Sequence, residues 1–274
     1  MSHINKSFLW LIAGLVLILG GCTHLKSVHQ VETCNDFSEW PLLEQKVAQR
    51  ILLHGLDHEA LYTLATDLKP MSTIHDFSYH TDSLQAAIPQ LTLWANIGAK
   101  LSCNGKKVVL MPFKNEFDGR KYLELLALDI KRVQKEIRRH PLFWAKLGIT
   151  ETTPVELVPL LVESAAKYDR WRGFGYLFGY PDYAVDFFVQ AGQEQDSTKQ
   201  FVKRDFFQIP VFAADKGHFT YAMPKGHTPD ATDSTRYIAA KNILGRYRLQ
   251  RMKHLRPAND NASQLLSILQ KNGN

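Results

Sequence analysis

Several histidines and acidic residues in the first third of the chain are of the types that bind a divalent metal ion. Imidazole and carboxylate groups suit zinc and related ions, and a metal with an open coordination position turns its bound water into a nucleophile. This pattern raises the hypothesis of a metal-dependent hydrolase. Because the spacing is irregular, solvated or loop-stabilising histidines are the alternative. The candidate ligands are His54, His58, His75, Asp76 and His80, with Asp57 beside them.

A second candidate site is an aromatic stretch, residues 168–189, with a turn at Gly179-Tyr180-Pro181. We expect a helix, a tight turn and a second helix from about Asp182 to Ala191. Large rings at helical spacing usually anchor the core, and the alternative is a ring-lined pocket for a sugar or another flat ligand. The rings are Tyr168, Trp171, Phe174, Tyr176, Phe178, Tyr180, Tyr183, Phe187 and Phe188. The pocket would be lined by Trp171, Tyr176, Tyr180, Tyr183 and Asp182.

Two carboxylates in this stretch, Asp182 and Asp186, lie four residues apart and therefore on one face of the predicted helix. Paired carboxylates can divide acid and base catalysis when their surroundings separate their pKa values. Asp182 also follows Pro181 at the predicted helix start, where a carboxylate can accept hydrogen bonds from free amide groups. We favour this capping role over catalysis.

A basic segment, residues 232–254, is predicted to be a helix that could bind the phosphates of lipid head groups or a polyanionic wall polymer. A solvated face, with Ile238, Ile243 and Leu244 turned inward, is the alternative. The basic residues of the segment and its flank are Arg236, Lys241, Arg246, Arg248, Arg251, Lys253 and Arg256, with Tyr237 and Tyr247 among them.

Familiar catalytic motifs are missing from the sequence. It contains no Gly-x-Ser-x-Gly elbow, no phosphate-binding loop ending in Gly-Lys-Ser/Thr and no Cys-x-x-Cys pair. Gly173-Phe174-Gly175 follows no apolar strand, so it does not indicate a nucleotide-binding turn. We therefore expect no cofactor other than a divalent metal, and a non-catalytic role is the favoured interpretation.

The N-terminus has the features of an export signal. Lys6 supplies a positive charge, Phe8 to Leu19 is apolar, and Gly20-Gly21 provides the small residues that a signal peptidase requires. The apolar run is shorter than the roughly twenty residues that span a bilayer. Cys22 follows at once, and Leu19-Gly20-Gly21-Cys22 resembles the lipobox of bacterial prolipoproteins. An ordinary signal peptide, or a short anchor with an incidental cysteine, is the alternative.

The resemblance implies that Cys22 is acylated and becomes the first residue of the mature chain. Several acyl chains give stable membrane attachment. Thr23 follows in place of the Asp that tends to retain such proteins in the inner membrane, so the resemblance implies an outer-membrane anchor with the body in the periplasm. The expected partners are the membrane, through its anchor, and another envelope protein, a wall polymer or a small ligand. The chain has a net charge of +6, but we do not expect nucleic acid as a ligand of a protein in this compartment.

Two further cysteines, Cys34 and Cys103, would form an even pair in an oxidising compartment. A disulfide between them would close a loop of about 70 residues and could stabilise the fold by roughly 4 kcal/mol. Two buried thiols, or a nucleophile, are the alternatives that the sequence leaves open.

The 274-residue chain is 45% hydrophobic, enough for a sizeable core. We expect an α+β fold, mainly α, as a helical body with two small β-hairpins. The domain plan is a lipoprotein signal peptide at 1–21, a lipidated tether at 22–37 and one periplasmic globular domain at 38–274. A polar stretch near 193–200 is the candidate for a boundary within that domain.

Hydrophobic periodicity places helices at about 41–55, 57–69, 82–99, 118–139, 141–147, 153–167, 232–254 and 262–270. Pro89 should kink or divide the third of these. Residues 71–81 show no clear period and are predicted to be a loop. One hairpin is predicted at Asn104-Gly105, and the other around residues 214–217.

Overall fold

A computed structural model describes residues 36–255 and 261–271. Contacts divide the chain into residues 1–32 and 33–274, and all described residues belong to the second unit. The predicted signal peptide, Cys22, most of the tether and Cys34 therefore lie outside the described residues. No helix within the described ranges combines the length and apolar character that a membrane crossing requires.

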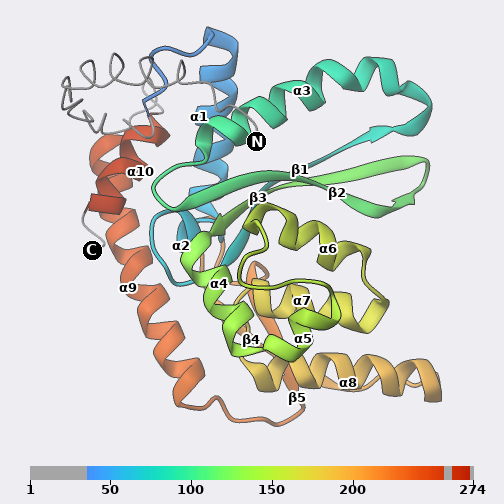
Figure 1. The fold of residues 1–274 in the computed structure, drawn as a ribbon. Helices are drawn as coiled ribbons and strands as arrows, with labels where there is room; N and C mark the ends of the chain where they lie inside the picture. Colours follow the sequence, from blue (N-terminus) through green and yellow to red (C-terminus); the bar gives the residue numbers. More distant parts are fainter. Residues whose placement is uncertain (1–35, 256–260, 272–274) are drawn as a thin grey trace, which may run out of the picture. The chain divides into compact units, whose positions relative to one another are not determined.

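The predicted fold class is confirmed: the described unit is α+β and mainly α, with two small antiparallel sheets (Figure 1). The helices are α1 Leu42–Asp57, α2 Leu61–Leu64, α3 Leu84–Leu101, α4 Ile130–Arg139, α5 Pro141–Lys146, α6 Val158–Ser164, α7 Lys167–Leu177, α8 Asp182–Thr198, α9 Ala231–His254 and α10 Ala262–Lys271. The strands are β1 Met71–His80, β2 Lys106–Phe117, β3 Arg120–Asp129, β4 Arg204–Ile209 and β5 Phe219–Pro224.

The first sheet corrects two predictions. It has the order β1-β3-β2, so the segment predicted to be a loop is edge strand β1, and the first part of the long helix predicted at 118–139 is central strand β3. The helix itself starts only at Ile130. Leu125 to Leu128 are buried on both faces of the sheet, so β3 forms a continuous apolar run without the alternation that usually reveals a strand.

The predicted first hairpin is also wrong. Asn104 and Gly105 both have positive φ, of 51° and 74°, but they join helix α3 to strand β2. The hairpin of this sheet turns instead at Asp118 and Gly119, whose φ angles are 51° and 63°. Positive φ at both central residues is the geometry of a tight two-residue hairpin turn. The two dipeptides thus share a backbone conformation, and only their flanking elements differ.

The three-stranded sheet separates two groups of packed side chains. Leu125 and Ala127 pack on one face against α1 and α3, and Leu126 and Leu128 pack on the other against the cluster that contains Val158 of α6. Figure 1 shows α3 along one side of the sheet and α4 to α7 on the other. Because successive residues of a strand point to opposite faces, β3 serves both cores at once.

The second predicted hairpin is confirmed. Strands β4 and β5 pair from Arg204 with Pro224 to Ile209 with Phe219. Helix α8 packs on β5 and α9 on β4. The polar stretch near 193–200 does not mark a connection over its whole length, because α8 continues to Thr198. Pro89 lies inside α3, which is a single helix and is not divided there.

Candidate functional site

The aromatic turn between α7 and α8 has the predicted helix–turn–helix form, and glycines allow close packing around it. Gly173 and Gly175 lie inside α7, where an added Cβ would meet Val162 and Val185 at 2.9 and 2.8 Å. Gly179 has a φ of 72°, and a Cβ there would lie 2.8 Å from Pro70. The glycines therefore let α7 approach its neighbours closely.

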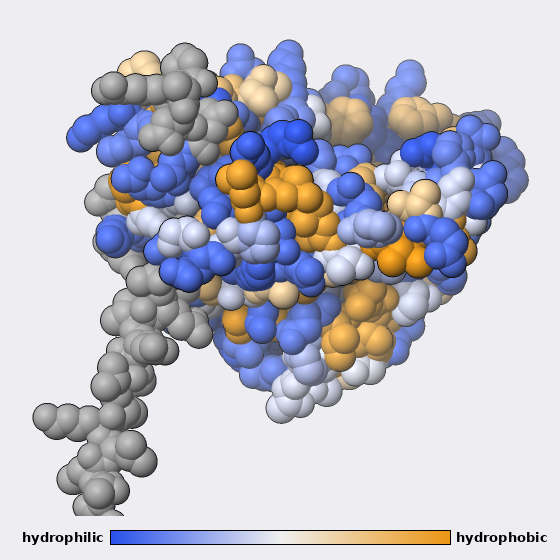
Figure 2. Space-filling view, turned by 90° about the horizontal axis from the view of Figure 1, so that it is seen from above, coloured by the Kyte–Doolittle hydropathy of each residue, from blue (hydrophilic) through white to orange (hydrophobic). Residues whose placement is uncertain are grey.

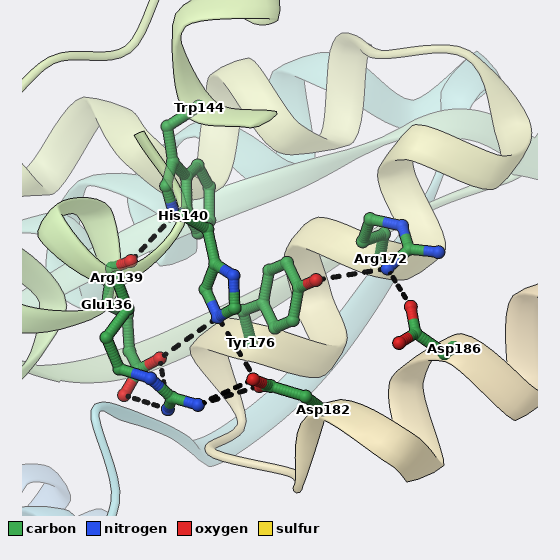
Figure 3. A network of polar contacts seen from close by, with 8 residues as sticks. All are labelled: Glu136, Arg139, His140, Trp144, Arg172, Tyr176, Asp182 and Asp186. Carbon is green, nitrogen blue, oxygen red and sulfur yellow. Dashed lines mark hydrogen bonds and ion pairs between the residues drawn. The ribbon is translucent and has the colours of Figure 1, made fainter. Parts of the chain in front are cut away.

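The turn joins a network of polar and aromatic side chains from α4, α5, α7 and α8 (Figure 3). Arg139 donates to both carboxylate oxygens of Asp182, at 2.8 Å each, and to Glu136 at 3.1 Å. Nε2 of His140 lies 3.3 Å from Asp182 and 4.0 Å from Glu136. The N-cap residue of α8 is Pro181 and Asp182 lies in the first turn, so Asp182 is at the positive helix end as predicted but is not itself the cap. Its carboxylate instead fastens the start of α8 to the end of α4 through a two-pronged arginine contact.

Aromatic rings complete this network. The ring of His140 stacks on Tyr176, with 4.0 Å between centroids and 7° between planes, and Trp144 donates from Nε1 to the Glu136 carbonyl at 3.0 Å. Arg172 donates to the Tyr176 hydroxyl at 3.0 Å and pairs with Asp186. Burial raises the pKa of Tyr176. Each carboxylate of the predicted Asp182–Asp186 pair is thus held by its own arginine.

The other candidate pocket residues lie in two further groups. Trp171 packs on Gly192 and Phe188. Tyr180 contacts Tyr221, with 5.5 Å between ring centroids, and Tyr183 donates to Asp233 at 2.9 Å. Of the five candidate residues, Tyr176 and Asp182 share a neighbour, because both contact His140. The rings thus pack against different neighbours and do not converge on one ligand position.

Asp233 is a buried acid that the sequence reasoning missed. It accepts hydrogen bonds from the hydroxyls of Tyr183 at 2.9 Å and Tyr221 at 2.6 Å, and from the amide of Asp230 at 2.9 Å. With Asp230 it forms the capping box of α9. Burial, together with donation to Asp233, raises the pKa of both tyrosines. The spacing Asp230-x-x-Asp233 before a helix was the available sequence signal.

A buried ion pair lies between the aromatic turn and the second sheet. Lys69 is 0% exposed, and its Nζ lies 2.5 Å from Glu59 and 4.3 Å from the ring centroid of Phe219. Burial lowers the pKa of Lys69, and the Glu59 carboxylate opposes that shift. A lysine without solvent contact is not open to a substrate, so this pair has the character of a packed core contact.

The histidines of the first candidate site partly come together. Nδ1 of His54 lies 2.9 Å from the Ile74 carbonyl, and the rings of His54 and His58 stack with 4.2 Å between centroids. His75 contacts His54 at 5.0 Å. His218, from the segment between β4 and β5, contacts His58 at 4.7 Å and was not predicted. His218 lies 160 residues after His58, so no local sequence pattern could connect the two.

The acidic member of that predicted site lies elsewhere. Residues 71–80 form a strand, so His75 and Asp76 point to opposite faces of the sheet. His75 pairs in register with Leu125, and Asp76 with Glu124. His80 contacts Arg120 at 2.6 Å, near the far end of β1. Among residues 36–255 and 261–271, no three His, Cys, Asp or Glu side chains are grouped so as to hold a metal ion.

Glu124 is a second acid that the sequence reasoning missed, because it lies in the apolar run of β3. Burial raises the pKa of Glu124 to about 7, further helped by the charges of Glu59, Asp76 and Glu163 and opposed by a hydrogen bond of 3.2 Å from Thr73. A lone acid within a buried strand was the signal. Such a carboxyl changes its charge near neutral pH.

Glu124 should make folding stability fall as the pH rises from about 4.5 to about 7. Its pKa in the folded state lies above the ordinary value of 4.5, so in this window the folded chain holds a proton that the unfolded chain has lost. The contribution is on the order of 3 kcal/mol at full effect. The free energy of unfolding of Glu124→Gln, measured with urea at several pH values in this window, should not show this fall with pH. Glu116→Gln, on the exposed part of β2, is the control and should keep the pH dependence of the parent. The same pH dependence of the unfolding free energy in the parent and in Glu124→Gln would contradict the account.

The predicted Cys34–Cys103 disulfide stays a prediction. Cys103 is half-buried in the connection between α3 and β2, where its carbonyl accepts a hydrogen bond from the amide of Lys106 at 2.8 Å. Cys34 lies outside the described residues.

Comparison with family models, with curated proteins and with solved structures gives no match to this chain.

Proposed function

We propose that this chain is a lipid-anchored bacterial envelope protein whose body has a non-catalytic binding or structural role. The carrying observation is the order of Lys6, the apolar run and Leu19-Gly20-Gly21-Cys22. Acyl chains on Cys22 would hold the protein at the outer membrane, with the body in the periplasm. The expected partners are the membrane through this anchor and an envelope protein, a wall polymer or a small ligand, and nucleic acid is not among them.

The contacts of the body support a binding or structural role. Charged groups in the candidate sites bond to one another, as Arg139 does to Asp182 and Lys69 to Glu59. The ring of Tyr176 is covered by His140. Such contacts fix elements relative to one another and fit a rigid body that presents its surface to a partner.

Replacing Cys22 tests the proposal. In bacterial cells that make lipoproteins and are fed radiolabelled palmitate, the full chain should take up label and sediment with membranes, since the thioether-linked chains are the anchor. Cys22→Ala should take up no label. Cys103→Ala is the matched control and should be labelled like the parent. Equal labelling of parent and Cys22→Ala would contradict the proposal.

A metal-dependent hydrolase is the alternative, and the gathering of His54, His58 and His75 is the observation that favours it. Metal analysis of the purified protein separates the two functions. The non-catalytic proposal expects no stoichiometric metal, whereas zinc or manganese that is lost on His75→Ala would favour the hydrolase.

A further inference from the structure

The outer side of α9 exposes large apolar side chains. Ile238 is 58% exposed, Leu249 63% and Met252 77%. They are spaced by eleven and three residues, so they lie along one side of the helix, while Ile243, Leu244 and Tyr247 on the other side are buried. Helix α9 runs along one side of the described unit, next to α10 (Figure 1).

Beyond its first turn, helix α9 carries charges of one sign only. Residues 234–254 contain no aspartate or glutamate. Two of the basic residues serve the fold, since Arg236 is largely buried and Arg251 donates to Asp57 at 2.8 and 2.9 Å. The exposed basic residues are Lys241, Arg246, Arg248 and Lys253. The helix therefore presents positive charge on both sides of its exposed apolar residues.

The surface around these residues is hollowed. One shallow hollow is lined by Lys241, Gly245 and Arg246, and nothing lies within 4 Å of the position that a Cβ of Gly245 would take. A second lies between α9 and α10, with Leu249 and Leu269 in its wall. Both combine apolar walls with basic groups.

We propose that the outer side of α9 rests on an anionic lipid surface, an inference that builds on the proposed lipid anchor. A bilayer with anionic head groups matches both features, because phosphates meet the basic side chains while apolar side chains enter the boundary between head groups and acyl chains. A wall polymer would engage the charges but leave Ile238, Leu249 and Met252 in water. A helix of 24 residues is about 36 Å long, which suits a flat contact.

Helix α3 offers a comparison. It exposes Leu84 and Ile88, and between Leu84 and Ala99 it has no charged residue. Its side of the unit, seen from above, carries hydrophobic patches among hydrophilic residues (Figure 2). An uncharged face lacks the groups that attract anionic head groups. A comparison of α9 with α3 therefore shows whether contact with lipid requires basic residues or only exposed apolar ones.

Photo-crosslinking to lipid tests this contact in the full chain. Benzoylphenylalanine replaces Met252, Ile88 or Leu142, the last being 88% exposed on α5. The protein, purified from membranes, is placed in vesicles of phosphatidylglycerol and phosphatidylethanolamine or of phosphatidylcholine alone. Position 252 should give at least about fivefold more lipid adduct than position 142, and only with the anionic vesicles. Position 88 should resemble position 142.

Charge reversal on α9 provides the second arm. The pair Arg248→Glu and Lys253→Glu should lower the lipid adduct at position 252 at least about fivefold. Lys131→Glu with Lys135→Glu, on the exposed side of α4, is the matched control and should leave the adduct unchanged.

The other outcomes separate failure of the contact from failure of the anchor. Equal lipid adducts at positions 252 and 142, or adducts at position 88 alone, would exclude α9 as the docking side, and an adduct of position 252 with a protein would indicate a protein partner. If the protein carries no palmitate yet position 252 still gives the lipid adduct with anionic vesicles, the anchor fails and the docking side stands. If it is acylated but gives no such adduct, the docking side alone fails.

Discussion

Asp233→Ala should lower the free energy of unfolding by about 3–5 kcal/mol. The carboxylate is fully buried and accepts from two tyrosine hydroxyls and one backbone amide. Alanine leaves these three donors without their partner in a region that water does not reach. It also removes half of the capping box at the start of α9.

Urea unfolding followed by circular dichroism measures this loss. Asp215→Ala is the matched control, because Asp215 is an exposed acid in the segment between β4 and β5 and should tolerate the same change with little effect. A fully stable Asp233→Ala protein would mean that the hydroxyls of Tyr183 and Tyr221 have other acceptors, against the arrangement described here.

Trp144→Ala should cost about 3–5 kcal/mol of folding stability. Trp144 is the largest of the fully buried side chains in the part of the chain that the structure describes. It is a member of the network of Figure 3, and its Nε1 is the donor to the carbonyl of Glu136. The substitution leaves a cavity and an acceptor without its partner, so packing and hydrogen bonding are lost together.

Leu142→Ala on the same short helix separates burial from helix propensity. Leu142 is 88% exposed, so its truncation should change the unfolding midpoint little. Similar losses for Trp144→Ala and Leu142→Ala would place the cost in helix α5 itself and would contradict the packing described for Trp144.

Local signals in the sequence were enough for several elements. Helix α9, the turn between α7 and α8, and the β4–β5 hairpin follow from periodicity, proline and glycine placement and turn residues. The sheet β1-β3-β2 did not follow, because β3 is buried on both faces and its leucines also fit a helical stripe. Asn104-Gly105 and Asp118-Gly119 have similar φ angles, and the second is a hairpin because the segments on both sides of it pair as strands β2 and β3.

The candidate sites depended on contacts far apart in the chain. The aromatic turn was located from composition. The partner of Asp182 is Arg139 and that of Tyr176 is His140, and both lie about forty residues earlier in the chain. Reading residues 71–81 as a loop placed His75 and Asp76 together, whereas a strand separates them by face. The burial of Asp233 and Glu124 depends on how distant parts of the chain pack together, which no local pattern shows.

The central claim is that Cys22 carries the acyl chains that fasten the protein to the envelope. Mass spectrometry of the N-terminal peptide from the membrane-extracted protein tests it most directly. The account predicts a mature chain that begins at Cys22, with a diacylglyceryl group on the sulfur and an acyl chain on the amino group. A chain that begins elsewhere, or an unmodified Cys22, would contradict the claim and remove the anchor on which the proposed function rests.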